Sequence, residues 1–122
     1  MTLLLVCLGA ALGAPARYLA DRAVQSRHDS VFPWGTLGVN VTGSLILGVV
    51  VGAATRHDVP SGLVAGVGTG FCGALTTYST FGYETVRLRR EGAGLLALSN
   101  VAAGLAVGVV AAFTGYAAGS AL

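Results

Sequence analysis

Residues 66–84, GVGTGFCGALTTYSTFGYE, combine glycines, hydroxyl side chains and two aromatic rings within an apolar part of the chain. Five of these residues are glycine, which weakens a regular helix and can free backbone carbonyls from their helical hydrogen bonds. In a bilayer, irregular backbone is tolerated only where protein covers it or where it lines a cavity. The segment therefore predicts an ion pathway.

Two rings in this segment, Tyr78 and Phe81, stand three positions apart, with Ser79 and Thr80 between them. On a helix the rings would share a face, and for an isolated pair that spacing usually indicates core packing. Here a glycine-rich stretch precedes the rings and hydroxyl groups lie between them, which favours a pathway. The positive ring edges can contact a partly dehydrated small anion, and hydroxyls can donate hydrogen bonds to it.

Asn40 lies in a second apolar run, PWGTLGVNVTGSLILG, and its amide needs hydrogen-bond partners wherever it is buried. Those partners could belong to a neighbouring helix, in a bond worth ~1 kcal/mol in membranes. They could equally be ions in a pore, and both alternatives stay open. Together with the ring and hydroxyl residues, Asn40 predicts an uncharged lining that suits a small anion without trapping it.

Gly73 and Thr76 mark the expected break in the helix of residues 61–86. Unwound carbonyls in broken membrane helices commonly bind sodium, so we hypothesise a buried structural Na+ at these two residues. The alternative is a break filled by water or by hydroxyl side chains.

Two charged residues flank the predicted pathway. Arg17 follows Pro15 near the end of the first apolar run, where it could draw anions into a cytoplasmic vestibule or simply extend to the membrane surface. Glu84 follows Phe81 by three positions and could cap a helix end or take part in gating. The cap is favoured, because acids inside a membrane are costly and interfacial ones are not.

The composition explains how these residues are held in place. The chain has 122 residues, of which 54% are hydrophobic and 10% charged, and its mean hydropathy is +0.77. These values predict an all-α integral membrane protein, with a single domain of four transmembrane helices and a break in the third. The expected spans are residues 2–22, 34–54, 61–86 and 93–118. Close glycine pairs on most spans, such as Gly9 and Gly13 or Gly48 and Gly52, predict tight helix packing.

Arginine is unevenly distributed over the predicted loops. Six arginines flank loops 1 and 3 (Arg17, Arg22, Arg27, Arg87, Arg89 and Arg90), against Arg56 in loop 2. The positive-inside rule therefore predicts a multi-pass protein of the inner (plasma) membrane with loops 1 and 3 in the cytoplasm and both termini outside.

Other chemistry is not indicated. His28 and His57 lie in loops on opposite sides, and neither a phosphate-binding loop nor a serine nucleophile elbow occurs in the sequence. The low charge makes a nucleic-acid partner improbable. An enzyme is not expected.

The residues described above resemble the Fluc or CrcB fluoride-channel family, small four-span proteins that export fluoride passively and lower its cytoplasmic level. Three motifs carry the resemblance over nearly the whole chain: GAPARY at 13–18, PWGTLGVNVTGS at 33–44 and GTGFCGALTTYSTFGYE at 68–84. The third is highly specific, and the first is weak alone. The resemblance implies fluoride resistance, a dual-topology dimer of antiparallel subunits in the lipid bilayer, and one central Na+ that is structural and not transported.

The functional residues of the family carry over by position. The implied fluoride pathway consists of Asn40, Tyr78, Ser79, Thr80 and Phe81. The carbonyls implied to hold sodium belong to Gly73 and Thr76, and Arg17 matches the vestibule arginine. Two features depart from the family pattern: Tyr78 replaces a usual phenylalanine, and residues 101–113 lack the serine often found in the fourth span, where Gly104 or Gly108 stands instead.

The arginine bias also bears on assembly. A homodimer of oppositely inserted copies needs little charge bias, so we hypothesise pairing with an oppositely oriented paralogue, with a homodimer as the alternative. Two further readings are a non-conducting partner subunit of a heterodimeric channel and a small multidrug-type proton-coupled exporter. The exporter needs a membrane-embedded acid in its first span, and residues 2–18 contain none.

Overall fold

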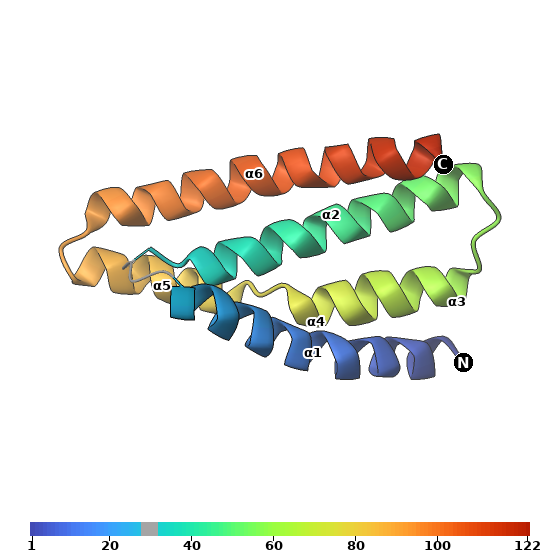
Figure 1. Ribbon diagram of the computed structural model, residues 1–122, viewed down its shortest axis with the longest axis horizontal. Coiled ribbons are helices and arrows are strands. Elements are labelled where there is room, and N and C mark those ends of the chain that lie inside the picture. Colours follow the sequence, from blue (N-terminus) through green and yellow to red (C-terminus); the bar gives the residue numbers. More distant parts are fainter. Residues whose placement is uncertain (28–31) are drawn as a thin grey trace.

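The computed structural model describes residues 1–27 and 32–122, and within these ranges the chain is helical and contains no strand. The predicted all-α class is confirmed. Three helices are long and apolar enough to cross a membrane: α1 (Thr2–Arg27), α2 (Trp34–Arg56) and α6 (Gly94–Ala121). Between α2 and α6 lie α3 (Ser61–Val64), η1 (Ala65–Cys72), α4 (Gly73–Leu75) and α5 (Ser79–Arg90). The segments run alternately back and forth, so both termini lie at the same end (Figure 1).

Prolines and a glycine define where helices begin and turn. α2 begins directly after Pro33 and α3 directly after Pro60. Amide hydrogens at the start of a helix have no carbonyl partner within that helix. Proline, which has no amide hydrogen, therefore loses no helical hydrogen bond at these positions. Gly92, with φ of 81°, turns the chain between α5 and α6. α1 continues to Arg27, beyond the expected residue 22, because hydropathy marks the apolar part of a helix and not its polar last turns.

The pass from α3 to α5 is irregular in two places. η1 is a π-helix, in which each hydrogen bond spans one residue more than in an α-helix. The helix then stops at Thr76, whose backbone is extended (φ −79°, ψ 162°), and α5 begins at Ser79. Gly73 itself is helical (φ −63°, ψ −36°), so the helix is interrupted at Thr76–Tyr78 and not at Gly73. Glycine can adopt helical geometry, so the flexibility of Gly73 does not end the helix. The helix ends where the backbone of Thr77 bonds to the side chain of Asn40 instead.

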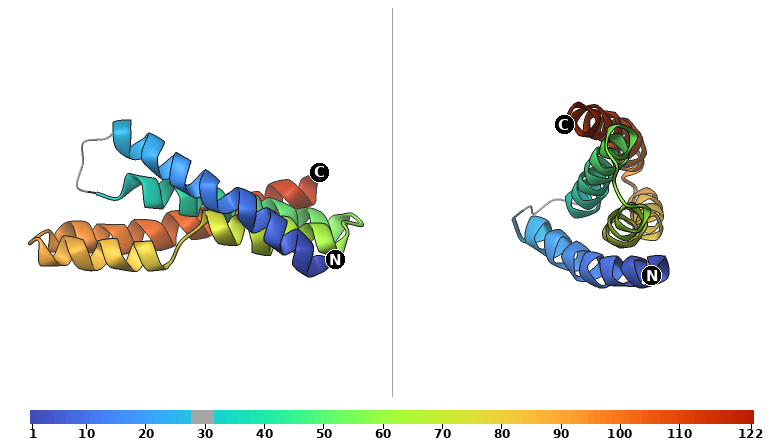
Figure 2. Two further views of the ribbon diagram at one scale, coloured as in Figure 1. Left: turned by 90° about the horizontal axis from the view of Figure 1, so that it is seen from below. Right: turned by 90° about the vertical axis from the view of Figure 1, so that its right-hand side faces the viewer.

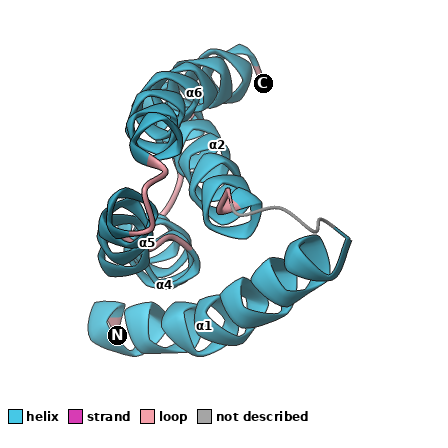
Figure 3. Ribbon diagram, turned by 90° about the vertical axis from the view of Figure 1, so that its left-hand side faces the viewer, coloured by secondary structure: helices cyan, strands magenta, loops and turns pink. Residues whose placement is uncertain are grey.

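Glycines shape the most extensive contact between helices, that of α2 with α6 (Figure 3). A Cβ atom added at Gly48 would overlap the carbonyl oxygen of Ala112, and one at Gly115 would overlap that of Leu45. Only a residue without a side chain allows the backbones to approach so closely. The packing interpretation of these glycines is confirmed.

α1 lies obliquely across the other helices and contacts η1 and α4 (Figure 2). Here Gly9 and Gly13 face the carbonyl oxygens of Gly66 and Phe71, again with no space for a Cβ atom. The pair on the middle of α6 differs. Gly104 faces the ring of Phe81, and the nearest atom to a Cβ added at Gly108 is a hydroxyl oxygen 4.0 Å away. These two glycines make room for side chains instead of backbone.

Candidate ion-binding site

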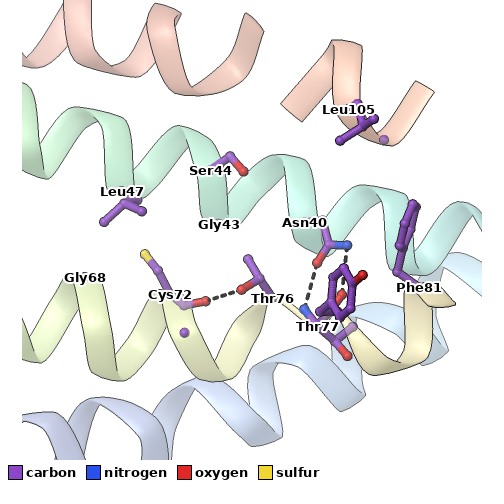
Figure 4. A pocket seen from close by; sticks show the side chains of 13 residues that line it. Asn40, Gly43, Ser44, Leu47, Gly68, Cys72, Thr76, Thr77, Phe81 and Leu105 are labelled. Carbon is purple, nitrogen blue, oxygen red and sulfur yellow. Dashed lines mark hydrogen bonds between the residues drawn. The ribbon is translucent and has the colours of Figure 1, made fainter. Parts of the chain in front are cut away.

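An open groove of about 370 Å³ lies between α2, α6 and the interrupted pass (Figure 4). We name it the central groove, and its lining residues are Asn40, Gly43, Ser44, Leu47, Gly68, Cys72, Gly73, Thr76, Thr77, Tyr78, Phe81, Gly104 and Leu105. Five of them were predicted as site residues: Asn40, Gly73, Thr76, Tyr78 and Phe81. The structure therefore brings most of the predicted site together from two separate passes of the chain, and α6 adds Gly104 and Leu105 to the lining.

Asn40 binds the backbone at the interruption through both ends of its amide. Its Nδ2 donates to the Thr77 carbonyl at 3.1 Å, and its Oδ1 accepts from the Thr77 amide at 2.8 Å (Figure 4). This pairing gives a non-helical residue the two hydrogen bonds that a helix would otherwise supply. One hydrogen of the Asn40 amide group is not used in these contacts, because a primary amide carries two.

The same pairing changes which carbonyls are bonded. In a continuous helix the Thr77 amide would donate to Gly73 and the Thr80 amide to Thr76. Among the described residues neither bond forms, since the Thr77 amide donates to Asn40 and the Thr80 amide donates to Thr77 Oγ1 at 3.2 Å. The Gly73 and Thr76 carbonyls thus lose their helical partners. They are the two carbonyls to which the sequence assigned a cation.

The two rings lie at the α5 end of the central groove. Their centroids are 6.4 Å apart with the planes tilted by 39°, within the range of an aromatic pair. Tyr78 precedes α5 and is 86% exposed, whereas Phe81 is half-buried against Gly104. The side chain of Ser79, the third residue predicted here, lies outside what the structure describes.

A second, smaller cavity of about 150 Å³ contains two more of the predicted residues, Arg17 and Thr80. We name it the arginine pocket, and it is lined by Arg17, Tyr18, Asp21, Thr36, Val39, Thr77 and Thr80. Arg17 is half-buried within α1, and its expected role in a vestibule stays a prediction. Thr77 lines both cavities, so the two adjoin at the interruption.

Glu84 belongs to neither cavity lining. Its Oε1 accepts a hydrogen bond from Thr36 Oγ1 at 2.9 Å, and its Oε2 lies 3.7 Å from an Arg87 Nη2. The favoured role as a helix-end cap is wrong, because α5 continues past Glu84 to Arg90 and the carboxylate bonds instead to α2. A role in gating stays a prediction.

Sequence reasoning overlooked three polar residues here. Thr77 is the bonded partner of Asn40, and Thr36 is only 2% exposed although it carries a hydroxyl. Asp21 lies on α1, one turn after Arg17, with a buried Oδ1 that has no hydrogen-bond partner in the described part of the chain. Residues 2–18 indeed contain no acid, but α1 continues through this one. The sequence signal that could have identified these residues is a polar side chain next to an apolar run.

Comparison with known proteins finds one matching family and relatives whose names agree with one another. A family model described as "CrcB-like protein, Camphor Resistance (CrcB)" matches residues 4–116. The chain is 59% identical over 127 residues to "Fluoride-specific ion channel FluC 1" of Frankia casuarinae, an alignment that covers 100% of this chain and 95% of that protein. The protein of the same name from Streptomyces avermitilis is 56% identical over 115 residues, covering 94% and 93% of the two chains. "Fluoride-specific ion channel FluC 2" of Rhodococcus jostii is 48% identical, covering 95% and 96%. These relatives are named as channels and not as enzymes.

Proposed function

Because the chain belongs to the CrcB family, we propose that it is a multi-pass membrane channel through which fluoride leaves the cell passively. The names of the relatives support the ion, and the three apolar helices support the membrane. The observation that carries the proposal within this chain is the Asn40 amide bonded to the interruption at Thr77, beside two rings in an open groove.

The central groove has the chemistry that a fast anion channel needs. Asn40 offers an unused amide hydrogen, and Tyr78 and Phe81 offer ring edges. No arginine lines this groove in the described residues, so an anion there meets weak donors and no positively charged side chain. Such a lining replaces part of the hydration of fluoride without binding it too tightly to leave.

The arginine pocket is the entrance to this pathway. Arg17 raises the local concentration of anions, and the hydroxyl of Thr80 continues the polar lining toward Thr77. The sequence also assigns Ser79 to this pathway. Glu84 and Thr36 form the polar contact next to it, where a change in their hydrogen bond would alter conduction.

A second subunit covers the central groove. The amide of Asn40 and the exposed ring of Tyr78 would otherwise face lipid, which cannot satisfy polar groups. Gly73 is exposed and an added Cβ there would meet no atom within 4 Å, so the surface is open for a partner. The partner is an antiparallel copy of the chain or an oppositely oriented paralogue, and the pair contains two pathways.

The sodium ion fits the two carbonyls that the interruption releases. Gly73 and Thr76 would hold it through backbone oxygen, the ligand type that hard cations prefer. When bound, the ion supplies fixed positive charge that stabilises the interface between the subunits. If so, exchange of sodium for the larger N-methylglucamine cation during purification should reduce the proportion of dimer, measured by light scattering.

The direct test is fluoride efflux from liposomes that contain the purified chain alone, recorded with a fluoride electrode, with chloride as the comparison anion and sodium present. Fast efflux selective for fluoride would support a self-sufficient channel and would contradict an obligate paralogue. If folded protein gives no efflux, conduction by this chain alone is refuted, and co-reconstitution with a paralogue becomes the deciding experiment.

Orientation is tested separately. By the positive-inside rule, the arginines at the ends of α1 and α5 favour a cytoplasmic location for that end of the molecule, with both termini outside. A cysteine introduced at Gly92, in the turn between α5 and α6, should be labelled by an impermeant reagent from the cytoplasmic side. The engineered chain should lack Cys7, which is exposed. Equal labelling from both sides would contradict a single orientation.

A further inference from the structure

Asn100 is a buried polar residue on α6 that no sequence motif uses. Its side chain is 1% exposed, although apart from Ser99 the first turns of its helix are apolar. Polar side chains within membrane helices are costly unless they are hydrogen-bonded, and they are often retained for a function. The position of its partners indicates which function.

The amide of Asn100 begins a chain of hydrogen bonds that ends at Phe81. Nδ2 of Asn100 donates to Thr85 Oγ1 at 2.8 Å, and Thr85 Oγ1 donates to the Phe81 carbonyl at 2.9 Å. A hydroxyl has a single hydrogen, so when Thr85 gives it to Phe81 its lone pair is left to accept from Asn100. Each bond polarises the next, so the two are stronger together than separately.

The same face of α6 also contacts the Phe81 ring. Gly104 follows Asn100 by one helical turn and thus lies on the same side of the helix. A Cβ atom at Gly104 would lie 3.0 Å from Phe81 Cε2, so the ring rests against the glycine surface. α6 therefore contacts Phe81 directly at the ring edge, through Gly104, and indirectly at the backbone carbonyl, through Thr85 of α5.

The backbone at Phe81 needs such support because the regular helix has only just resumed. Phe81 is in the first turn of α5, directly after the residues that leave the helix, and its ring lines the central groove. Few helical hydrogen bonds precede it to fix the backbone. A shift of this backbone would move the ring relative to Asn40.

We propose that Asn100 is a positioning residue that acts through Thr85 to hold the Phe81 ring in the central groove, and thereby sets fluoride selectivity without touching the ion. The inference rests on the proposed function, since it requires Phe81 to line the fluoride pathway. A purely structural Asn100 would instead stabilise the contact between α5 and α6 and leave conduction by the folded protein unchanged.

The test uses the full chain with Thr85→Val, which keeps the shape and removes the hydroxyl, and Asn100→Leu, which removes the amide. Each should lower fluoride efflux per folded dimer by about 5-fold, the effect of one buried hydrogen bond, and should lower discrimination against chloride. Thr85→Ser keeps the hydroxyl and should restore efflux to within about 2-fold of the original. The double variant should lose little more than either single variant, because both break one chain of bonds.

Thr55→Val is the matched control. Thr55 Oγ1 donates to the Gly52 carbonyl at 2.6 Å, a similar bond to the preceding turn of its own helix, but far from the central groove near the end of α2. This variant should conduct as the original protein does. If Thr85→Val and Thr55→Val both lower efflux equally, the effect is general helix destabilisation and the proposal is wrong.

A second readout does not depend on conduction. With 4-fluorophenylalanine placed at position 81, the ¹⁹F resonance should shift or broaden in Thr85→Val and stay unchanged in Thr55→Val. An unchanged resonance in folded Thr85→Val would overturn the positioning role whatever the flux. Conversely, if the resonance responds but Phe81→Leu leaves selective fluoride efflux intact, positioning is supported and the proposed pathway through Phe81 is refuted.

Discussion

Along the interface of α2 and α6 the helices meet through glycines, whereas at Thr76–Tyr78 the chain meets α2 through hydrogen bonds. At the first place Gly48 and Gly115 lie against bare carbonyl oxygens, and shape alone determines the contact. At the second place the amide of Asn40 satisfies backbone that has left the helix. The difference separates two tasks: the glycine interface stabilises the fold, and the polar contact forms the candidate site. Substitutions in the glycine interface should therefore lower the melting temperature, and substitutions at the polar contact should lower fluoride efflux.

The largest effect is expected at the polar contact. Asn40→Asp replaces the donor to the Thr77 carbonyl with a negatively charged acceptor in the path of an anion. Fluoride efflux should fall by about 100-fold or more, since repulsion between unit charges at contact amounts to several kcal/mol even in a partly polar site. Size-exclusion chromatography should still show assembled protein. Undiminished efflux would remove Asn40 from the pathway.

A substitution in the glycine interface should lower stability and leave conduction unchanged. Gly48→Ala places a methyl group against the Ala112 carbonyl, and the helices must separate, at a cost of about 2 kcal/mol. The melting temperature in detergent should fall while efflux per folded protein stays near its original value. Gly38→Ala on the same helix is the control, because a Cβ atom there meets nothing within 4 Å. Equal melting temperatures for the two variants would contradict the packing argument.

A smaller effect is expected in the arginine pocket. Asp21→Asn removes the negative charge near Arg17 and should raise fluoride efflux about 2- to 5-fold at low ionic strength, with the difference shrinking as salt is added. Asp58→Asn, a change to an exposed acid between α2 and α3, serves as the control. A decrease in efflux for Asp21→Asn would show that its carboxylate assists the anion or holds the pocket together.

The smallest effect is expected at Tyr78, where the family usually has phenylalanine. Tyr78→Phe keeps the ring edge and removes a hydroxyl that makes no hydrogen bond within the described residues, so efflux should change by less than about 2-fold. Tyr83→Phe, at an exposed residue of α5 outside the groove, gives the baseline. A gain of tenfold or more in Tyr78→Phe would instead indicate that the tyrosine limits this subunit and that a partner normally conducts.

Local structure was predictable from the sequence where a residue type has one strong conformational or hydrogen-bonding preference. Pro33 and Pro60 preceded helices, and the glycine pairs on α1, α2 and α6 predicted close packing. Asn40 was recognisable as a candidate site residue because a buried amide in an apolar run needs hydrogen-bond partners, although which group provides them was left open. The structure answers that both of its ends bind the backbone of Thr77.

What the sequence did not predict depends on contacts between distant residues. The helix stops at Thr76 and not at Gly73 because Asn40, far away in the chain, takes the Thr77 amide. The bond between Thr36 and Glu84 depends equally on the meeting of α2 and α5. The π-helix η1 has no compositional signature, because its longer hydrogen bonds can form with the same residues as an α-helix.

The shared location of the two termini affects how the chain could be engineered (Figure 1). In an antiparallel pair, the last residue of one subunit and the first residue of the other would lie on opposite sides of a bilayer about 30 Å thick. A flexible tether cannot cross that layer, so a single gene encoding both subunits would require an extra apolar helix of about 20 residues between them. A short soluble tether would force the two copies to insert in the same direction, which provides a genetic means to abolish antiparallel assembly without altering any residue of the channel.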